Sequence, residues 1–304
     1  LREQAHALDK GGVDVLFFST IIAAECDERE IDTLECFCRG NRFQVYAERF
    51  IDATGNGDVA HLSGCRWHRG VEAKLWPQEV THKAMHWPSN LEDTENLLRQ
   101  GLFHRTVRHA RQVDPLNATA LTAAMRRMSR AIWSDQDRMG RLWTAQDIGI
   151  RTSRIIQGVE AVSDDDAWEL RKHDHAVARS SWELDVHPPD DDLPSPRMLH
   201  SRSPEYRERA LRVADGDWFD LPYGAIVAED VDNLLLAGRM VSSGYLAQGS
   251  LRIQQTCMAT GWAAGIAAAV SLKRGLSPKD LPASSVAEHC SFPPLPGATK
   301  EELK

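Results

Sequence analysis

Long apolar runs and blocks of basic residues are both lacking in this 304-residue chain. A helix needs about 18 or more consecutive apolar residues to cross a bilayer, and the most apolar stretch, residues 262–270, is too short. Lys and Arg number 36 against 44 Asp and Glu, which gives a net charge of −8. Because this excess of negative charge repels phosphate backbones, we expect neither nucleic acid nor a membrane as a partner.

Metal-binding motifs are lacking as well. Of six cysteines, only Cys36 and Cys38 stand close together. Residues i and i+2 of a strand rarely form a disulfide, and a zinc site needs a second close pair. His82 and His86 have i, i+4 spacing without the glutamate of H-E-x-x-H, so we expect solvated surface histidines. The sequence predicts no metal site and free thiols in a reducing, cytoplasmic compartment.

The sequence also lacks an initial Met and a signal segment, since it opens at Leu1. Residues 1–10 carry apolar side chains on one face and are followed by Gly11 and Gly12, a pattern typical of the last turns of a helix. We therefore expect a missing N-terminal segment, or a partner chain, to complete this part of the fold.

Short apolar segments follow Gly12. Residues 13–19 (VDVLFFS) form an unbroken apolar run, which predicts a strand buried in a parallel sheet. Segments 21–27, 32–39 and 43–50 are joined by tight turns, which predicts an antiparallel meander. Two further buried strands, each ending at a glycine, are expected over residues 50–55 and 233–238.

The composition changes between residues 61 and 214, which hold seven of the nine tryptophans. Patterns in this part predict helices over 92–102 and 118–133, and three consecutive acids at 164–166 indicate a helix start. We interpret this part as a second, substrate-facing domain inserted into the first.

A long helix is expected after residue 249. Ser250 is suited to cap it, the helix would reach Lys273, and Gly275 would stop it. Gly261 and Gly265 share one face of this helix, which predicts that another backbone approaches closely there.

Residues 55–60 (GNGDVA) form a G-x-G-x-x-A pattern directly after a predicted strand. Such a turn is typical of dinucleotide binding, where backbone amides face a pyrophosphate. In a Rossmann unit, the glycine turn is followed by a helix and then by a second parallel strand that carries an acid about 20 residues on. Residues 64–70 do not have the sequence pattern expected at this place. The competing interpretation is a strand-ending turn that needs glycine for its backbone conformation.

The segment 233–265 has strand, loop and helix in succession and directs a helix N-terminus near Gly249 toward the carboxyl end of a strand. Ligands bind at this edge in α/β folds, and a positive helix end suits a partly anionic group such as a reduced flavin. A buried Ala-rich helix that only packs on the sheet is the alternative.

Five segments in order resemble the glutathione-reductase-like class of FAD-dependent oxidoreductases. They are residues 51–58 (IDATGNGD), 150–158 (IRTSRIIQG), 185–187 (DVH), 222–223 with 232–239 (PY and DNLLLAGR), and 247–265. Asn56 stands where that family usually has Asp, and Ile155 and Gly224 stand where Arg is usual. The family's opening strand, G-x-G-x-x-G turn and helix have no counterpart in the sequence.

The resemblance implies an α/β fold with an incomplete glutathione-reductase-like FAD-binding domain, an antiparallel β-meander and an inserted, largely helical cap domain. The FAD-binding domain would comprise residues 1–60 and 215–275, the cap residues 61–214, and a C-terminal tail residues 276–304.

The resemblance also implies roles for single residues. Cofactor contacts are expected from Thr54, Gly55, Gly238, Arg239, Gly249, Ser250 and Arg252. His187, Arg151 and Arg154 would lie near the flavin face as catalytic residues. A histidine suits proton transfer near neutral pH, and arginines orient carboxylates by forked hydrogen bonds. Inter-domain salt bridges for the two arginines, and a loop role for the histidine, are the alternatives.

The function implied is an FAD-dependent oxidoreductase that acts on a small polar metabolite by hydride transfer to or from flavin. Two alternatives remain. One is a non-catalytic fragment or subunit of a flavoprotein that cannot bind FAD alone, and the other is an NAD-dependent dehydrogenase built on residues 55–60.

Overall fold

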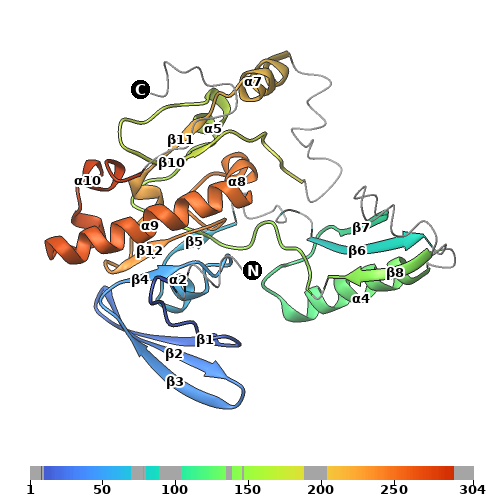
Figure 1. Cartoon of the computed structure of the whole chain (residues 1–304), viewed down its shortest axis with the longest axis horizontal. Coiled ribbons are helices and arrows are strands. Elements are labelled where there is room, and N and C mark those ends of the chain that lie inside the picture. The colour runs from blue at the N-terminus through green and yellow to red at the C-terminus, as the bar shows by residue number, and fades with distance from the viewer. Residues whose placement is uncertain are drawn as a thin grey trace.

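The computed structural model describes residues 8, 10–69, 78, 80–88, 104–134, 139–145, 147–187 and 204–290. Over these residues the chain mixes helices with several small sheets (Figure 1). The long helix α9 (Gln254–Arg274) runs through the main body, a β-meander lies at one end, and a sheet with helix α4 (Ala118–Ser134) extends to the side. No helix of the described part is long and apolar enough to cross a membrane.

The predicted meander is confirmed. Strands β1 (Thr20–Asp27), β2 (Glu30–Cys38) and β3 (Asn41–Tyr46) form an antiparallel sheet in the order β1-β2-β3. Tight turns after β1 and β2 join them, which is why consecutive strands pair with each other. One face of β2 is buried and packs toward the main body.

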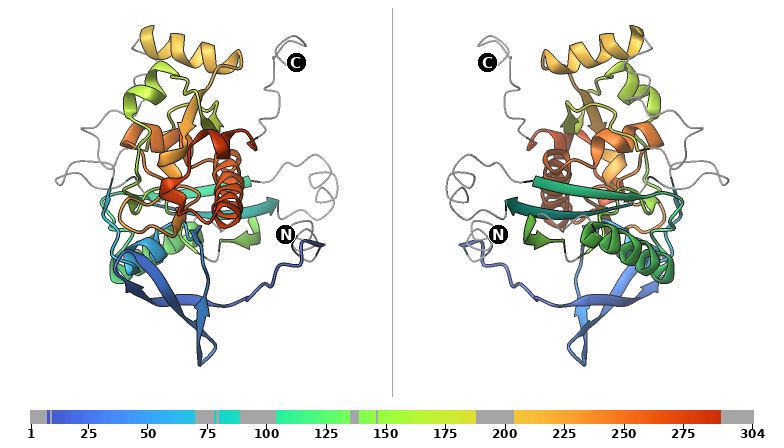
Figure 2. Two further views of the ribbon diagram at one scale, coloured as in Figure 1. Left: turned by 90° about the vertical axis from the view of Figure 1, so that its left-hand side faces the viewer. Right: turned by 90° about the vertical axis from the view of Figure 1, so that its right-hand side faces the viewer.

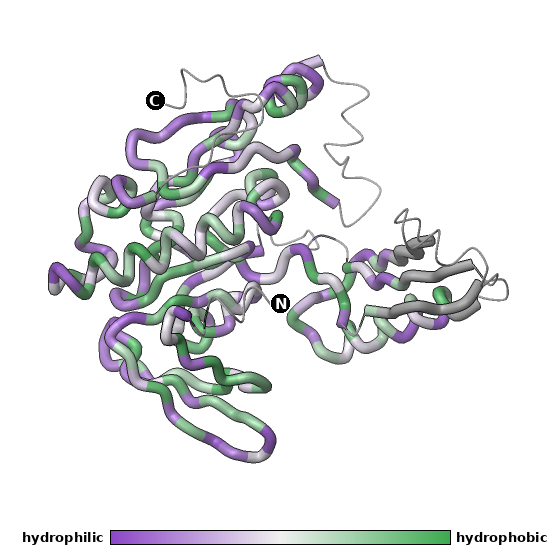
Figure 3. The backbone as a smooth tube through the Cα atoms, in the orientation of Figure 1, coloured by the Kyte–Doolittle hydropathy of each residue, from purple (hydrophilic) through white to green (hydrophobic). Residues whose placement is uncertain are grey.

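The buried strand expected over residues 13–19 is wrong. Residues 13–18 adopt no strand, and the side chains of Phe17 and Phe18 are 68% and 74% exposed. Figure 3 shows apolar backbone in green, including stretches of the meander that this segment enters at β1. An apolar run indicates burial only where a neighbouring strand is present to cover it, and among the described residues none pairs with this segment.

The two other predicted strands are present and lie side by side; β12 is wholly buried, whereas β4 is buried at Phe50 and Asp52 and 39% exposed at Ile51. Strand β4 (Phe50–Asp52) pairs in parallel with β12 (Leu234–Leu236), with Ile51 opposite Leu235. All three leucines of β12 are fully buried, and helix α9 covers one face of the pair. The parallel pairing brings the glycine turns after both strands to the same edge of the sheet.

The single long helix predicted after residue 249 is two helices. Helix α8 (Tyr245–Leu251) ends before Ile253, whose extended backbone (ψ 154°) starts α9. Ser250 therefore lies inside α8 and caps nothing, whereas Gly275, at φ 64°, ends α9 as expected. Nothing in the described part lies within 4 Å of a Cβ built at Gly261 or Gly265, so the close backbone contact expected there is wrong for these residues.

In the described part of residues 61–214 strands are as prominent as helices, so the expectation of a largely helical cap is wrong. Residues 80–148 of this part are called the insert below. Strands β6 (Val80–Pro88), β7 (His104–Ala110) and β8 (Met139–Thr144) form an antiparallel sheet in the order β7-β6-β8. Helix α4 confirms the helix predicted over 118–133 and packs on this sheet through a small core of its own. His82 lies buried on β6 rather than on a solvated helix face. Residues 92–102, expected to be helical, lie outside the described part.

Further short elements complete the described part, which Figure 2 shows from two sides. They are α2 (Asp58–Leu62), β5 (Trp67–His68), β9 (Ile155–Ile156), α5 (Asp164–Glu169), β10 (Ala176–Ser180), α7 (Pro204–Ala214), β11 (Phe219–Pro222), η1 (Tyr223–Ile226), η2 (Pro278–Asp280) and α10 (Ser284–Ala287). Strands β5 and β9 pair antiparallel, as do β10 and β11. The helix start expected at residues 164–166 is confirmed, with Ser163 and Asp166 forming a capping box.

Candidate functional site

The turn after β4 is built around the buried carboxylate of Asp52. Its Oδ1 accepts hydrogen bonds from the backbone N and Oγ1 of Thr54, and its Oδ2 accepts one from the N of Ala60. Oγ1 of Thr54 in turn accepts from the N of Asp58. These bonds hold the glycine turn against α2, so Thr54 is occupied within the turn itself.

Two glycines in this turn have positive φ, and each has a close neighbour. At Gly55 (φ 75°) a Cβ would lie 3.0 Å from Nη1 of Arg239, and at Gly57 (φ 67°) it would lie 2.5 Å from Cδ1 of Ile156. The guanidinium of Arg239 therefore rests directly on the turn. Gly238, at φ 88°, precedes this arginine and has open space where a Cβ would stand.

The side chain of Asn56 joins the two glycine turns. Its Oδ1 accepts from Nη2 of Arg239 at 2.7 Å and from Oγ of Ser153 at 2.9 Å. Arg154 donates to the backbone O of Asn56 and, at 2.8 Å, to Oδ1 of Asp58. The guanidinium of Arg154 also lies over the ring of Trp67. Arg154 thus forms a salt bridge with Asp58, which agrees with the alternative interpretation of this arginine as a salt-bridge residue rather than a catalytic one.

Arg239 differs from Arg154 because no carboxylate of the described residues pairs with it. Its Nε is buried and lacks a hydrogen-bond partner in the described part. Burial lowers the pKa of its guanidinium, and the nearby charge of Arg252 acts in the same direction. Asp58 adds a weaker opposing charge, but no carboxylate of the described residues contacts the half-buried Arg239. A cation partly removed from water without a paired carboxylate is costly, so the geometry favours an anionic group at this position.

A second group of residues surrounds His187. Nε2 of His187 lies 3.1 Å from Oδ1 of Asp185, and Nη2 of Arg252 lies 3.0 Å from Oδ2 of the same carboxylate. The ring of His109, on β7, stacks on the ring of His187 with the centroids 6.3 Å apart. The site is therefore built from the insert, from the loop after β10 and from the α8–α9 junction.

Buried amides tie this loop to α8. Oε1 of Gln78 accepts from the N of His187 at 3.0 Å, and its Nε2 donates to Gln248 and Thr152. Gln248 donates to the backbone O of Arg151. The segment of residues 151–154 therefore links the His187 group to the Asn56 group, since Ser153 and Arg154 belong to the latter.

The remaining predicted cofactor contacts are packed. Gly249 lies against the backbone of Asp185, and the hydroxyl of Ser250 donates to the backbone O of Trp182. The first amides of α8 donate to the carboxylate of Asp164, whose pKa burial raises. The N-terminus of α8 is thus already satisfied by Asp164. Flavin contacts by Gly249 and Ser250 stay predictions.

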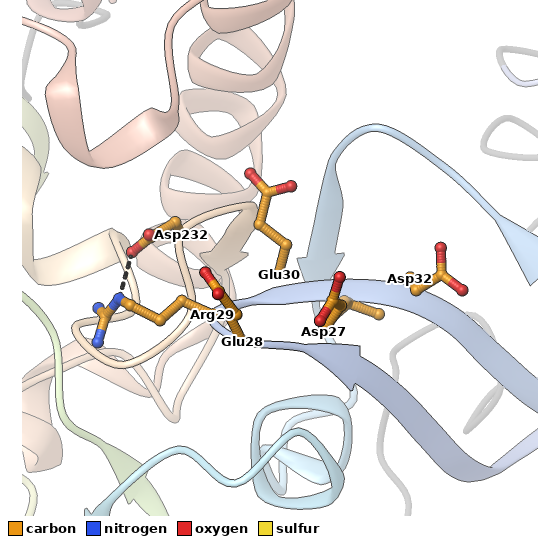
Figure 4. A pocket seen from close by; sticks show the side chains of 7 residues that line it. Asp27, Glu28, Arg29, Glu30, Asp32 and Asp232 are labelled. Carbon is orange, nitrogen blue, oxygen red and sulfur yellow. Dashed lines mark hydrogen bonds and ion pairs between the residues drawn. The ribbon is translucent and has the colours of Figure 1, made fainter.

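A pocket away from these residues lies at the β1–β2 turn (Figure 4). It is lined by carboxylates of residues 27–32 and by Asp232, which pairs with Arg29. No group of three or more potential metal ligands occurs among the described residues. None of the residues expected to be functional lines this pocket.

Sequence reasoning missed Gln78, His109 and the role of Asp185. Gln78 and His109 stand in segments without a motif, so no signal could have found them. Asp185 belongs to the D-V-H segment noted in the sequence, and its spacing two residues before His187 was the available signal.

Comparisons with known proteins add one finding. The family model described as "FAD dependent oxidoreductase" matches residues 4–127 and 77–289. No curated protein and no solved structure matches the chain.

Proposed function

The chain belongs to the family of FAD-dependent oxidoreductases, and from this premise we propose that it oxidises or reduces a small polar metabolite by hydride transfer to or from FAD. The observation that carries the proposal is Arg239, a half-buried arginine whose Nε is buried and unbonded and which has no carboxylate partner in the described part, at the edge where β4 and β12 end. Ligands of open α/β sheets bind at this edge.

The residues present fit an anionic part of FAD. Arg239 supplies a positive charge and a buried Nε that lacks a hydrogen-bond partner. Next to this guanidinium, the positive-φ turns at Gly55 and Gly238 present backbone rather than side chains. Space for a Cβ at Gly238 is open. We propose that Gly55, Gly238 and Arg239 face the cofactor, while Thr54 holds the turn beneath them.

Bound FAD supplies a two-electron centre that exchanges hydride with the substrate. The chain's own contribution is proton handling and orientation. His187 is the proposed proton acceptor for a substrate hydroxyl, since an imidazole exchanges protons near neutral pH. Arg151 stays a proposed substrate-orienting residue. Arg154 is held by Asp58 and Trp67, which supports a structural link more than a catalytic role.

Uncovered apolar surface supports the proposal that a further segment or partner chain completes the cofactor site. In the described part, β4 pairs only with β12, and Ile51 on β4 is 39% exposed. On α9, Met258 and Trp262 are 71% and 64% exposed. A strand added to β4, followed by a helix packed on α9, would cover both surfaces, and an isolated chain would then bind FAD weakly.

The NAD-dependent alternative has less support. Helix α2 after the glycine turn has only five residues, and the next strand, β5, pairs antiparallel with β9 instead of extending the parallel β4–β12 pair. The second parallel strand that a nicotinamide-binding unit needs is therefore not supplied by this segment. The division into FAD-binding and cap domains and the cytoplasmic location remain predictions.

The test is titration of FAD, followed by flavin fluorescence and visible absorption, into this chain and into a version extended upstream along its coding sequence. Binding by the chain itself supports a sufficient site, and binding only by the extended version supports the completing segment. Arg239→Met should weaken the binding about tenfold or more, because a charge-assisted contact is lost. Arg212→Met, which removes an arginine paired with Asp217 on the surface, should not. Absence of FAD binding by both versions would refute the proposal.

A further inference from the structure

The guanidinium of Arg239 is held by a neutral oxygen. Its Nη2 donates to Oδ1 of Asn56 at 2.7 Å, and it forms no salt bridge with a carboxylate of the described residues. We propose that Asn56 is a positioning residue, which fixes Arg239 on the glycine turn without neutralising it and so reserves its charge for the anionic part of the cofactor. This inference rests on the proposed function, in which Arg239 faces FAD.

The first argument is the way in which two arginines receive different acceptors. The carboxylate of Asp58 lies 2.8 Å from Nη1 of Arg154 and pairs with it. The acceptor for Arg239, by contrast, is the amide oxygen of Asn56, a residue only two positions before Asp58. An aspartate has nearly the same shape as an asparagine but carries a charge. The turn therefore neutralises one arginine and leaves the other one charged.

The second argument is that the amide of Asn56 has a fixed orientation. A guanidinium can only donate, so the atom that faces Nη2 of Arg239 is the amide oxygen. Oγ of Ser153, a residue that is 1% exposed, donates to the same oxygen at 2.9 Å. Arg154 donates to the backbone O of Asn56. These bonds hold Asn56 independently of Arg239, and a side chain supported in this way is suited to orient another.

The third argument is the state of the Arg239 guanidinium. A Cβ at Gly55 would lie 3.0 Å from its Nη1, so the group lies against the turn, and its buried Nε has no hydrogen-bond partner in the described part. Burial lowers its pKa, the charge of Arg252 acts in the same direction, and the charge of Asp58 opposes them more weakly. A carboxylate at position 56 would supply the missing counter-charge at once, and the fold has an amide there instead.

It follows that stability and cofactor affinity are in conflict at Asn56. A carboxylate in its place would pair with Arg239 and stabilise the cofactor-free protein, but it would also compete with an anionic ligand for the same guanidinium. If the Asn56 side chain only held the turn together, substitutions there would lower stability and affinity together. Opposite changes in the two quantities therefore distinguish a positioning role from a purely structural one.

The decisive experiment is thermal unfolding of the cofactor-free protein at neutral pH, followed by circular dichroism. Asn56→Asp should raise Tm by about 2 °C or more, because the new ion pair is partly shielded from water. In the Arg239→Met background the same substitution should give no rise, since the carboxylate then lacks its partner. Asn41→Asp adds the same charge at an exposed position of β3 and should change Tm little. A lower Tm for Asn56→Asp, a failure of this variant to fold, or an equal rise in the Arg239→Met background would overturn the proposal.

The second readout is the affinity for FAD, measured by flavin fluorescence in the version of the chain that binds the cofactor. Asn56→Asp should weaken binding about tenfold or more, because the guanidinium of Arg239 is then neutralised. Asn41→Asp should leave the affinity unchanged. Asn56→Ala removes the acceptor without adding a charge, so it should lower both Tm and affinity. An Asn56→Asp protein that binds FAD as tightly as the wild type would overturn the proposal.

The two readouts separate this inference from the proposed function. Thermal unfolding needs neither flavin nor substrate, so its outcome does not depend on whether the chain binds FAD. Absence of FAD binding by both versions of the chain would refute the proposed function and the cofactor as the ligand of Arg239. The Tm values would still show whether Asn56 holds this arginine without compensating its charge.

Discussion

Arg209 is buried and Arg239 is half-buried, and neither pairs with a carboxylate in the described part. Arg239 lies at the proposed cofactor site, whereas Arg209 lies in α7 with only its Nε bonded, to the backbone O of Ala167. Burial lowers the pKa of Arg209 to about 10, which leaves the group charged at neutral pH. The cost of this charge is not offset by any proposed ligand.

We predict that Arg209→Met stabilises the protein. Methionine keeps the aliphatic packing and removes the buried charge, so unfolding should require about 1–3 kcal/mol more, a rise in Tm of several degrees. Arg212→Met, in the same helix but exposed and paired with Asp217, is the control and should change little. Scanning calorimetry at neutral pH compares the three proteins, and a lower Tm for Arg209→Met would contradict the prediction.

Replacing Asp52 is expected to destabilise the protein, in contrast to the replacement of Arg209. All three hydrogen bonds that it accepts come from donors of the glycine turn, so an amide NH₂ in place of one oxygen would face another donor. Asp52→Asn should therefore destabilise the fold by about 2–3 kcal/mol. Urea unfolding checks this, with Asp165→Asn, at an exposed acid of α5, expected to cost less than about 1 kcal/mol. Equal losses in the two variants would show that the turn does not depend on the acceptor.

At the scale of elements, the capping box of α5 predicts a dependence on pH. Burial raises the pKa of Asp166, but hydrogen bonds from Ser163 and the charge of Arg171 outweigh it, so the pKa is lowered in the fold. A carboxyl with a lowered folded pKa contributes stability that is complete above its unfolded value, 3.8, and is lost as the pH falls through the folded value.

We therefore expect Asp166→Asn to lower Tm at neutral pH and the difference from wild type to shrink below about pH 4. Thermal unfolding followed by circular dichroism between about pH 7 and pH 3 measures it. Asp165→Asn changes a neighbouring exposed acid of the same helix turn and should show a much smaller difference. If the Tm difference between wild type and Asp166→Asn instead grew as the pH fell, the ionised carboxylate of Asp166 would not be the stabilising form, and the prediction would be wrong.

The elements that local patterns predicted correctly are those whose partners are near in the sequence. The meander, α4 and the α5 start depend on adjacent turns and caps, and all three are confirmed. Residues 13–18 were misjudged because an apolar run does not tell which strand, if any, covers it. His82 and His86 were predicted to be solvated surface histidines, but strand pairing with β7 and β8 places both on β6, where His82 is buried.

The candidate site follows the same division. Gly55, Gly238 and Arg239 stand in segments with a recognisable order of strand, turn and helix, so the sequence could predict that they lie near one another. The stacking of His109 on His187 and the bridge made by Gln78 join residues about 80 to 110 positions apart. Such contacts depend on how the insert folds back, which no local pattern encodes.

At the scale of the whole molecule, the described residues form two separate hydrophobic cores. The main core extends from the meander through β4, β12 and α9 to β10 and β11, while the insert has a small core of its own. The buried members of the small core are Val80, Val113, Ala124, Met128 and Ile148. So few buried side chains supply little stabilisation, and a region of low local stability opens before the rest.

We predict that α4 and strands β6–β8 open as a unit at a lower free energy than the main core. Native-state hydrogen exchange with mass spectrometry should show faster exchange in α4 than in α9, and Met128→Ala should accelerate exchange in α4 and strands β6–β8 but not in α9. Met240→Ala, a cavity in the main core, should instead accelerate exchange in both helices, because global unfolding exposes both. Since His109 reaches His187 from this sheet, opening of the insert would also separate the two imidazoles. Equal exchange in α4 and α9 of the wild type would mean that the two cores unfold together.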